Sequence, residues 1–327
     1  MDPLFFLLCL LLLVLLAVVF SLILFARPRP ARVPLKGRHV LVSGGSSGIG
    51  FALARRAAAE GARVSILARD QTRLEEARDA IRLATGVDAL VLVADVRDPA
   101  AVTSALEEAG PVDVLVCNQG VFLPLELEQQ SMEEVRFTMD VNLMGTFHLI
   151  KAALPAMKRK AEETGVPASI ALMSSQAGQV GVYGYSAYSA SKFALRGLAE
   201  ALQHEVIMDN IHVTLIFPPD TDTPGLAEEL KRRPEITSII AASAGGMKAD
   251  DVAKKALNGI KSAQFVVPCN IEGTMLSIAT AGLSPQPSFA WAFVEVMGAS
   301  LMRLIGLFFQ WNWFCAIEKW HAKKKCA

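Results

Sequence analysis

Tyr188 and Lys192 are the two side chains of this sequence best placed to move a proton. They are four residues apart, so on a helix they lie on one face within reach of each other. A phenol has a pKa of about 10 and is a poor acid–base group at neutral pH unless its phenolate is stabilised. An ammonium about 4 Å away contributes about 4 kcal/mol at an effective dielectric of roughly 20, which predicts a lowered pKa for Tyr188. A serine hydroxyl upstream, on Ser174 or Ser175, completes a set that favours proton donation to a carbonyl oxygen.

A tyrosine and a lysine at this spacing also occur by chance on many helices, but a glycine-rich loop far upstream favours chemistry. The loop reads Ser-Gly-Gly-Ser-Ser-Gly-Ile-Gly over residues 43–50, after an apolar run and before a helical pattern that ends at Gly61. Glycines let the backbone approach a pyrophosphate, and a helix N-terminus offers free N–H groups. A plain turn is the alternative, but the order strand, loop, helix favours a dinucleotide site. The residues expected to bind the cofactor here are Gly44, Ser46, Ser47, Gly48, Ile49 and Gly50.

Two arginines after the second apolar run predict which dinucleotide binds. A protein that binds NAD places an acidic side chain at the ribose 2′-hydroxyl. This sequence instead has Arg69 at the end of the strand and Arg73 one helical turn later. Two guanidinium groups suit a 2′-phosphate, so the sequence predicts NADPH. The alternative is a pair of solvated arginines on a surface helix, whose N-cap is expected at Asp70.

These motifs together resemble the short-chain dehydrogenase/reductase family. The resemblance rests on Tyr-x-x-x-Lys with a serine thirteen residues before the tyrosine, which makes Ser175 the match, and on the glycine loop, where Ser43 replaces the usual threonine. It implies that a nicotinamide cofactor delivers hydride to a ketone carbon while Ser175 and Tyr188 hydrogen-bond the ketone oxygen. It also implies that Tyr188 donates the proton and that Lys192 holds the nicotinamide ribose.

The resemblance implies further site residues. Asp95 and Val96 match the pair that contacts adenine, and Asn118 matches the asparagine after the fourth strand, although Gln119 replaces the alanine that usually follows. Asn142 matches the catalytic asparagine, whose implied role is to hold a water that passes protons to Lys192. A helical asparagine is otherwise more often a solvated or capping residue.

The run Pro-Pro-Asp-Thr-Asp-Thr-Pro-Gly at 218–225 departs from the Pro-Gly-x-x-x-Thr common in the family. With the N-terminal apolar run, the segment 174–181 and the helix expected at 188–200, it closely resembles the 3-ketodihydrosphingosine reductases of sphingolipid synthesis. That resemblance implies reduction of a long-chain sphingoid ketone by NADPH. We hypothesise that Asp220 and Asp222 attract the ammonium of such a substrate, with turn formation as the alternative.

Two other functions stay open. One is a membrane-anchored reductase of a steroid, retinoid or 3-ketoacyl substrate, against which the 218–225 run argues. The other is an NADPH-binding sensor or scaffold that kept the fold and lost its chemistry. The complete set of Asn142, Ser175, Tyr188 and Lys192 argues against it.

Seven short apolar runs alternate with helical patterns in the middle of the chain. Alternation of this kind predicts a parallel sheet with crossover helices, so we expect a Rossmann-like, doubly wound α/β fold with seven strands. The expected strands are 39–42, 64–67, 90–93, 114–117, 170–173, 213–217 and 265–267.

The N-terminal run Leu4–Phe25 has no charge, glycine or proline and is long enough to cross a bilayer. A cleaved signal peptide is the alternative, but no basic segment precedes the run. Basic residues follow it, which places the rest of the chain in the cytosol; they are Arg27, Arg29, Arg32, Lys36 and Arg38. We expect a transmembrane anchor at 1–26, a basic, proline-containing stalk at 27–36, the reductase domain at 37–268 and a hydrophobic membrane-associated region at 269–327.

The C-terminal region has two apolar stretches, Ile271–Leu283 and Phe289–Ile317, of which the second contains Glu295 and Arg303. They predict two short membrane passes, a re-entrant or interfacial hairpin, or a hydrophobic lid over the substrate. In the membrane alternatives the indoles of Trp311, Trp313 and Trp320 lie near the headgroups. The end Lys323-Lys324-Lys325-Cys326-Ala327 resembles the dilysine signal of endoplasmic reticulum membrane proteins. That signal needs a cytosolic tail, and hence an even number of later crossings, zero included.

Composition excludes some classes of function. The 327 residues carry a formal net charge of +0, which does not favour nucleic-acid binding. The five cysteines are scattered without metal-ligand or disulfide spacing and are expected to be free thiols, and the histidines form no ligand-spaced pair. We therefore expect no metal. Family members often pair through the helix that carries the catalytic tyrosine, which implies a possible homodimer.

Overall fold

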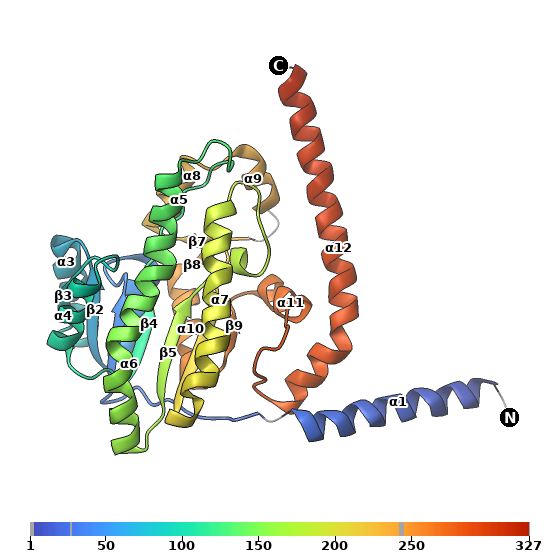
Figure 1. Ribbon diagram of the computed structural model, residues 1–327, viewed down its shortest axis with the longest axis horizontal. Helices are drawn as coiled ribbons and strands as arrows, with labels where there is room; N and C mark the ends of the chain where they lie inside the picture. The colour runs from blue at the N-terminus through green and yellow to red at the C-terminus, as the bar shows by residue number, and fades with distance from the viewer. Residues whose placement is uncertain (1–2, 27, 242–244, 327) are drawn as a thin grey trace.

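The computed structural model describes residues 3–26, 28–241 and 245–326, without the side chain of Cys326, so Arg27 and that side chain lie outside the described residues. A seven-stranded parallel sheet forms its centre, in the order β3-β2-β1-β4-β5-β6-β9 (Figure 1). The strands are β1 His39–Ser43, β2 Arg63–Ala68, β3 Leu90–Val93, β4 Val114–Cys117, β5 Ala168–Met173, β6 Ile211–Phe217 and β9 Val266–Pro268. The predicted doubly wound α/β fold is confirmed, with strand bounds within two residues of those expected.

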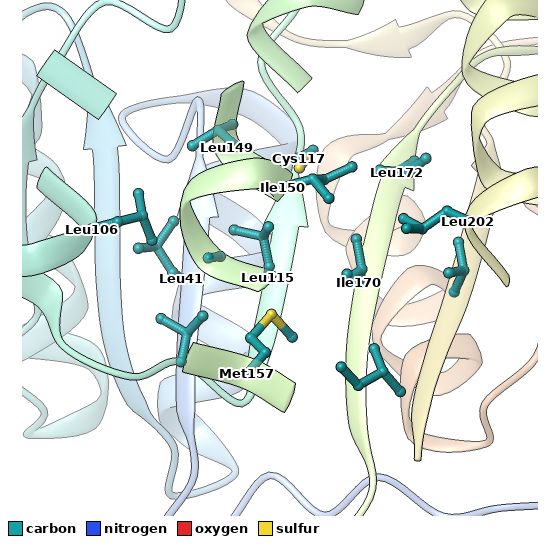
Figure 2. Packing of buried hydrophobic residues seen from close by; sticks show 14 of the residues in the cluster. Leu41, Leu106, Leu115, Cys117, Leu149, Ile150, Met157, Ile170, Leu172 and Leu202 are labelled. Carbon is teal, nitrogen blue, oxygen red and sulfur yellow. The ribbon is translucent and has the colours of Figure 1, made fainter. Parts of the chain in front are cut away.

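Helices cover both faces of the sheet because successive strand residues point to opposite faces and the residues on both faces are apolar. On β1, Leu41 packs toward one helical layer, whereas Val40 and Val42 pack toward the other. Figure 2 shows the first of these cores, in which Leu115 and Ile170 meet side chains of the covering helices. The helices on that face are α4 Pro99–Ala109, α6 Gly145–Thr164 and α7 Ser186–Val206. On the other face they are α2 Gly48–Ala59, α3 Gln71–Thr85 and α10 Ala249–Lys261.

Local signals set the helix ends near the expected cofactor site. Asp70 caps α3 by accepting a 3.1 Å hydrogen bond from the backbone N–H of Arg73, as the sequence predicts. Gly61 follows α2 with a φ of +81°, a conformation that suits glycine and stops the helix. The carboxyl ends of the strands and the first turns of these helices therefore lie on one edge of the sheet.

Small elements surround the carboxyl edge of the sheet. α5 Met132–Met139 continues through a π-helical turn, Asp140–Met144, into α6, and a 3₁₀ turn follows β5. The segment after β6 forms β7 Thr221–Asp222, which pairs with β8 Met247–Lys248, a pairing absent from the sequence prediction. The helices α8 Pro224–Leu230 and α9 Glu235–Ala241 complete this side.

The C-terminal region forms one short and one long helix, which differs from the predicted alternative of two short membrane passes. The first apolar stretch forms α11 Ile271–Ala279, whose 9 residues rise about 14 Å and are too short for a core of about 30 Å. The second forms one helix of 38 residues, α12 Phe289–Cys326. The prediction of two short membrane passes is therefore wrong. Both α12 and α1 Pro3–Phe25 are long and apolar enough to cross a membrane.

Helix α12 runs alongside the sheet domain, whereas α1 points away from it (Figure 1). Near the start of α12, Ala292 is buried. Near its end, the Trp320 ring packs edge-on against the Tyr183 ring at 6.1 Å, and its Nε1 donates a 3.3 Å hydrogen bond to Glu235. The end of α12 therefore contacts the domain, and α12 also packs against α11.

Acid is expected to destabilise the fold through His39, at the start of β1. Burial, and then the Arg63 charge, lower the pKa of this imidazole from 6.5 to about 4. Between pH 6.5 and 4 this histidine is therefore protonated in the unfolded chain but neutral in the folded one. The free energy of unfolding is then at its full value above about pH 6.5 and falls by about 3 kcal/mol toward pH 4. Thermal unfolding of the detergent-solubilised chain across this range should show His39→Gln to be less acid-sensitive than wild type. An equal acid shift of both midpoints would contradict this role.

Candidate active site

Tyr188, Ser175 and Lys192 come together beyond the carboxyl end of β5. Ser175 begins the 3₁₀ turn Gln176–Gly178, and its hydroxyl accepts a 3.1 Å hydrogen bond from the backbone N–H of Ala177. The Ser175 hydroxyl and the Tyr188 phenol line the same pocket, and hydrogen bonding to Ser175 opposes the rise in the Tyr188 pKa that burial causes. Two rings, Phe122 at 5.6 Å and Tyr185 at 5.5 Å, pack edge-on against Tyr188. The phenol is thus held beside a second hydroxyl at the wall of a pocket.

Ser174 has a different place from its neighbour. Its hydroxyl donates a 3.0 Å hydrogen bond to the backbone carbonyl of Lys192, and its side chain is buried. A Cβ on Gly178 would lie 2.4 Å from that hydroxyl oxygen, so only glycine lets the turn approach α7 this closely. Of the two predicted serines, Ser175 contacts Tyr188 and Ser174 ties the turn to the helix.

The electrostatics of the pair differ from the sequence prediction. Burial raises the pKa of Tyr188 to about 12 and lowers that of Lys192 to about 8. The Lys192 ammonium donates a 2.8 Å hydrogen bond to the carbonyl of Met173 and lies 5.6 Å from the centre of the Tyr188 ring. The predicted lowering of the Tyr188 pKa is therefore wrong for the protein alone, because burial, and then the charges of Asp220 and Glu229, raise it. Tyr188 stays a protonated phenol at neutral pH.

Asn142 lies in the π-helical turn between α5 and α6, an irregularity frequent at functional sites. Its amide Nδ2 donates to the Val121 carbonyl and the Ser191 hydroxyl, each at 2.9 Å, and its Oδ1 accepts from the Val121 N–H at 2.8 Å. A Cβ added at Gly120 would lie 3.5 Å from both the Asn142 Oδ1 and the Lys192 Nζ. Asn142 therefore fixes the loop after β4 next to Lys192.

Gln119 joins this loop to the glycine-rich loop. The Ser43 hydroxyl donates to its Oε1, and its Nε2 donates a 2.9 Å hydrogen bond to the Thr146 hydroxyl. Thr146 in turn donates to the backbone carbonyl of Asn142 at 2.9 Å. The departure at Gln119 thus gives a buried network in place of a small side chain.

The loop 43–50 fits a dinucleotide phosphate. Gly44 has a φ of +62°, and a Cβ on Gly50 would lie 2.2 Å from the carbonyl oxygen of Gly44. Ser46 and Ile49 flank the turn, and the Ser47 side chain, at the N-cap of α2, makes no capping hydrogen bond within the described residues. The first N–H groups of α2 are therefore directed at the space where a pyrophosphate would bind.

The remaining predicted cofactor residues line the same edge. Arg69 is exposed at the end of β2, and the exposed Arg73 pairs with Asp70 at 3.6 Å. Asp95 is held by Arg97, whose hydrogen bond lowers the pKa of that carboxyl. Val96 is buried, and the Asn118 amide donates to the carbonyls of Ser43 and Gly44. Two exposed guanidinium groups, of which that of Arg73 is paired with Asp70, therefore lie near the end of β2.

Comparison with known proteins identifies the family. The short chain dehydrogenase family model matches residues 38–234. The chain belongs to the short-chain dehydrogenase family. That match ends before α9, so α1, α11 and α12 lie outside it.

The similarity to individual reductases extends beyond the residues that the family model matches. The chain is 61% identical over 301 residues to a 3-dehydrosphinganine reductase of Arabidopsis thaliana, covering 92% of both chains. It is 37% identical to the 3-ketodihydrosphingosine reductase of Mus musculus, covering 86% of this chain and 85% of the relative. Among solved structures, 3-ketoacyl-(acyl-carrier-protein) reductase of Brucella melitensis, complexed with NADH, is 27% identical with a TM-score of 0.65, covering 72% of this chain and 97% of that one.

In this short-chain dehydrogenase the pocket at Tyr188 has a charged wall that the sequence analysis missed. Arg233 forms ion pairs of 2.6 Å with both Asp220 and Glu229, and the Tyr185 hydroxyl donates to Glu229 at 2.6 Å. All four residues line the pocket, whose volume is about 140 Å³. The i, i+4 spacing of Glu229 and Arg233 is the one signal that could have predicted their pairing. Asp222, by contrast, is exposed outside this pocket.

Proposed function

We propose that this chain reduces the keto group of 3-dehydrosphinganine, a long-chain amino ketone, to the alcohol in sphingolipid synthesis. The observation that carries the proposal is the 61% identity to a plant 3-dehydrosphinganine reductase over 92% of both chains. The constellation of Ser175, Tyr188 and Lys192 at one pocket supports it, since it can bind and protonate a ketone oxygen. The steroid, retinoid and 3-ketoacyl alternatives have no comparable support.

Residues of this chain can supply the proton that the ketone oxygen takes up. Ser175 and Tyr188 are proposed to donate hydrogen bonds to the ketone oxygen, and Tyr188 then gives its proton to the oxygen as it becomes an alkoxide. With a pKa of about 12 the phenol is fully protonated before the step, and it can give up its proton because the forming alkoxide is a stronger base than the phenolate. The Lys192 ammonium stabilises the phenolate left behind, and a proton from solvent restores the phenol. Asn142 is proposed to hold the loop over Lys192, and its relay of protons through a water stays a prediction.

NADPH is the proposed cofactor, and when bound it supplies the hydride for the ketone carbon. The uncapped start of α2 and the glycines of the loop would hold its pyrophosphate. Arg69 and Arg73 would hold the 2′-phosphate, which favours NADPH over NADH. Asp95, Val96 and Asn118 would line the adenine and ribose side, and Lys192 the nicotinamide ribose.

The direct test is NADPH oxidation by the detergent-solubilised chain with 3-ketosphinganine, beside a steroid ketone and with NADH in place of NADPH. Turnover of the amino ketone with NADPH is expected. Turnover of the steroid alone would contradict the proposed substrate but would still support the proposed reductase chemistry. Binding of NADPH without turnover of either ketone would favour the sensor or scaffold alternative.

Asp220 is predicted to attract the substrate ammonium, whereas Asp222 is not. With Glu229 and Arg233, Asp220 gives the pocket wall a net negative charge, and its side chain is still 36% exposed. Asp220→Asn leaves Glu229 and Arg233 as a balanced pair, so we expect the KM for the amino ketone to rise about fivefold with little change in kcat. Asp222→Asn is the matched control. An unchanged KM in both variants would reduce Asp220 to a structural partner of Arg233.

We propose an endoplasmic reticulum membrane location with the reductase domain in the cytosol. The apolar α1, the basic stalk and the tail lysines at 323–325 support it. Helix α12 contacts the domain through Trp320 near its end, which favours a tail on the domain's side of the membrane. The division at 26, 36 and 268 is proposed as the domain organisation, and a homodimer stays a prediction.

A further inference from the structure

A large cavity separates helix α12 from the sheet domain. Its volume is about 1270 Å³, above the range of about 300–1,000 Å³ usual for small-molecule sites. It shares wall residues with the small pocket at Tyr188, namely Ser175, Tyr185, Pro219 and Asp220. One end of the cavity therefore meets the small pocket that Tyr188 lines.

The far wall of this cavity is apolar and comes from successive turns of α12, through Met302, Ile305, Phe309, Trp313 and Ile317. Helix α11 and the loop after Ser175 form the facing wall, with Val180, Met275, Leu276 and Ala279 among its residues. The cavity is thus polar at Ser175 and Asp220, where it meets the small pocket, and mostly apolar along α12.

Three charged side chains also reach the cavity wall. Lys255 and Arg303 are exposed, so their charges lie at the rim. Glu272 is half-buried, and burial raises the pKa of its carboxyl, which favours the neutral form. These residues leave the apolar length of α12 available to an uncharged ligand chain.

The opposite face of α12 carries an exposed apolar stripe. Its members recur three and four residues apart, as on one helical face; they are Val294, Met297, Leu301, Leu304, Phe308 and Trp311, between 43% and 64% exposed. A long apolar stripe on a surface helix fits a membrane interface. Helix α1, which is apolar throughout, contacts α12, so the same side of the molecule carries the anchor (Figure 1).

We infer that the cavity holds the alkyl chain of the substrate, and that α12 lies on the membrane surface as the wall between that chain and the lipid. This inference rests on the proposed function and adds the place where the long chain binds. A ligand with its polar head at Tyr188 and its tail along α12 occupies both the small polar pocket and the large apolar cavity. Its tail can then pass from bilayer to cavity along one apolar helix.

Gly306 offers a clean test because it lines the cavity in the middle of α12 and an added Cβ there meets no described atom within 4 Å. Gly306→Phe therefore places a ring in the cavity without moving the backbone. We expect kcat/KM for 3-ketosphinganine to fall at least about tenfold, with no change for an analogue whose alkyl chain is cut to a few carbons. Leu307→Trp adds bulk on α12 outside both the cavity lining and the stripe, where the side chain is 44% exposed, and should leave the turnover of both substrates unchanged.

Equal losses for both substrates in Gly306→Phe, with NADPH binding intact, or no loss for either, would overturn the inference. Should the variant fail to bind NADPH, crosslinking of wild type by a long-chain amino ketone with a photoreactive chain end decides. Labels on α11 and the cavity face of α12 support the inference, and labels elsewhere overturn it. If wild type reduces neither substrate, the proposed function has failed, and the position of the crosslink still reports on the cavity separately.

Discussion

Replacing Tyr188 by phenylalanine is expected to lower kcat for 3-ketosphinganine by about 10²- to 10⁴-fold, the usual contribution of a positioned acid. The ring contacts with Phe122 and Tyr185 survive this change, so the fold and the pocket wall persist. What is lost is the proton that the alkoxide takes. Steady-state NADPH oxidation measures the loss, and NADPH binding by fluorescence is expected to stay near wild type.

Tyr185→Phe is the matched comparison for this experiment. Tyr185 lines the same pocket, but its hydroxyl is directed at Glu229. Its removal costs one hydrogen bond near the site, so we expect less than about a tenfold loss. Similar losses in the two variants, or a small loss in Tyr188→Phe, would remove Tyr188 from the role of proton donor.

The sheet and the glycine loop could be predicted because their causes are local. Each central strand is a short, nearly continuous apolar run such as Val114–Cys117, buried on both faces. The loop needs glycine where backbone atoms touch, as at Gly50, and the residue type itself reports that contact. The cap at Asp70 is likewise set within four residues.

The other features depend on partners far away in the sequence. Whether Lys192 lowers the pKa of Tyr188 depends on how dry the site is, and no spacing reports desolvation. The partner of Asp220 is thirteen residues away across α8, and the Gln119 side chain bonds Ser43 of β1 and Thr146 of α6. These contacts appear only after the chain has packed.

The C-terminal region shows the same limit. Its composition indicates lipid contact but does not separate a spanning helix from one that lies on a surface, because α12 is apolar on opposite faces. The contact of Trp320 with Tyr183 decides where the helix lies relative to the domain. Of the predicted alternatives, the hydrophobic lid is the one that the cavity beneath α12 supports.

The double variant Arg69→Gln, Arg73→Gln is expected to change the preference for NADPH over NADH, expressed as the ratio of kcat/KM values, by about 100-fold. Each charge-assisted hydrogen bond to a phosphate contributes about 1.5–3 kcal/mol, and 1.4 kcal/mol corresponds to about tenfold. The effect should fall on the KM for NADPH, since neither arginine lies near Tyr188 or Lys192. Arg69 is expected to contribute more than Arg73, because Asp70 already shares the Arg73 guanidinium.

Arg82→Gln supplies the control, because Arg82 lies in the last turn of the same helix and is bonded to Asp79 rather than directed at the cofactor edge. Removing its charge tests whether any loss of positive charge on α3 weakens the binding of NADPH. We expect the NADPH to NADH ratio to stay at the wild-type value in Arg82→Gln. A ratio unchanged in the double variant as well would mean that the two arginines are merely solvated, and the preference for NADPH would then need another source.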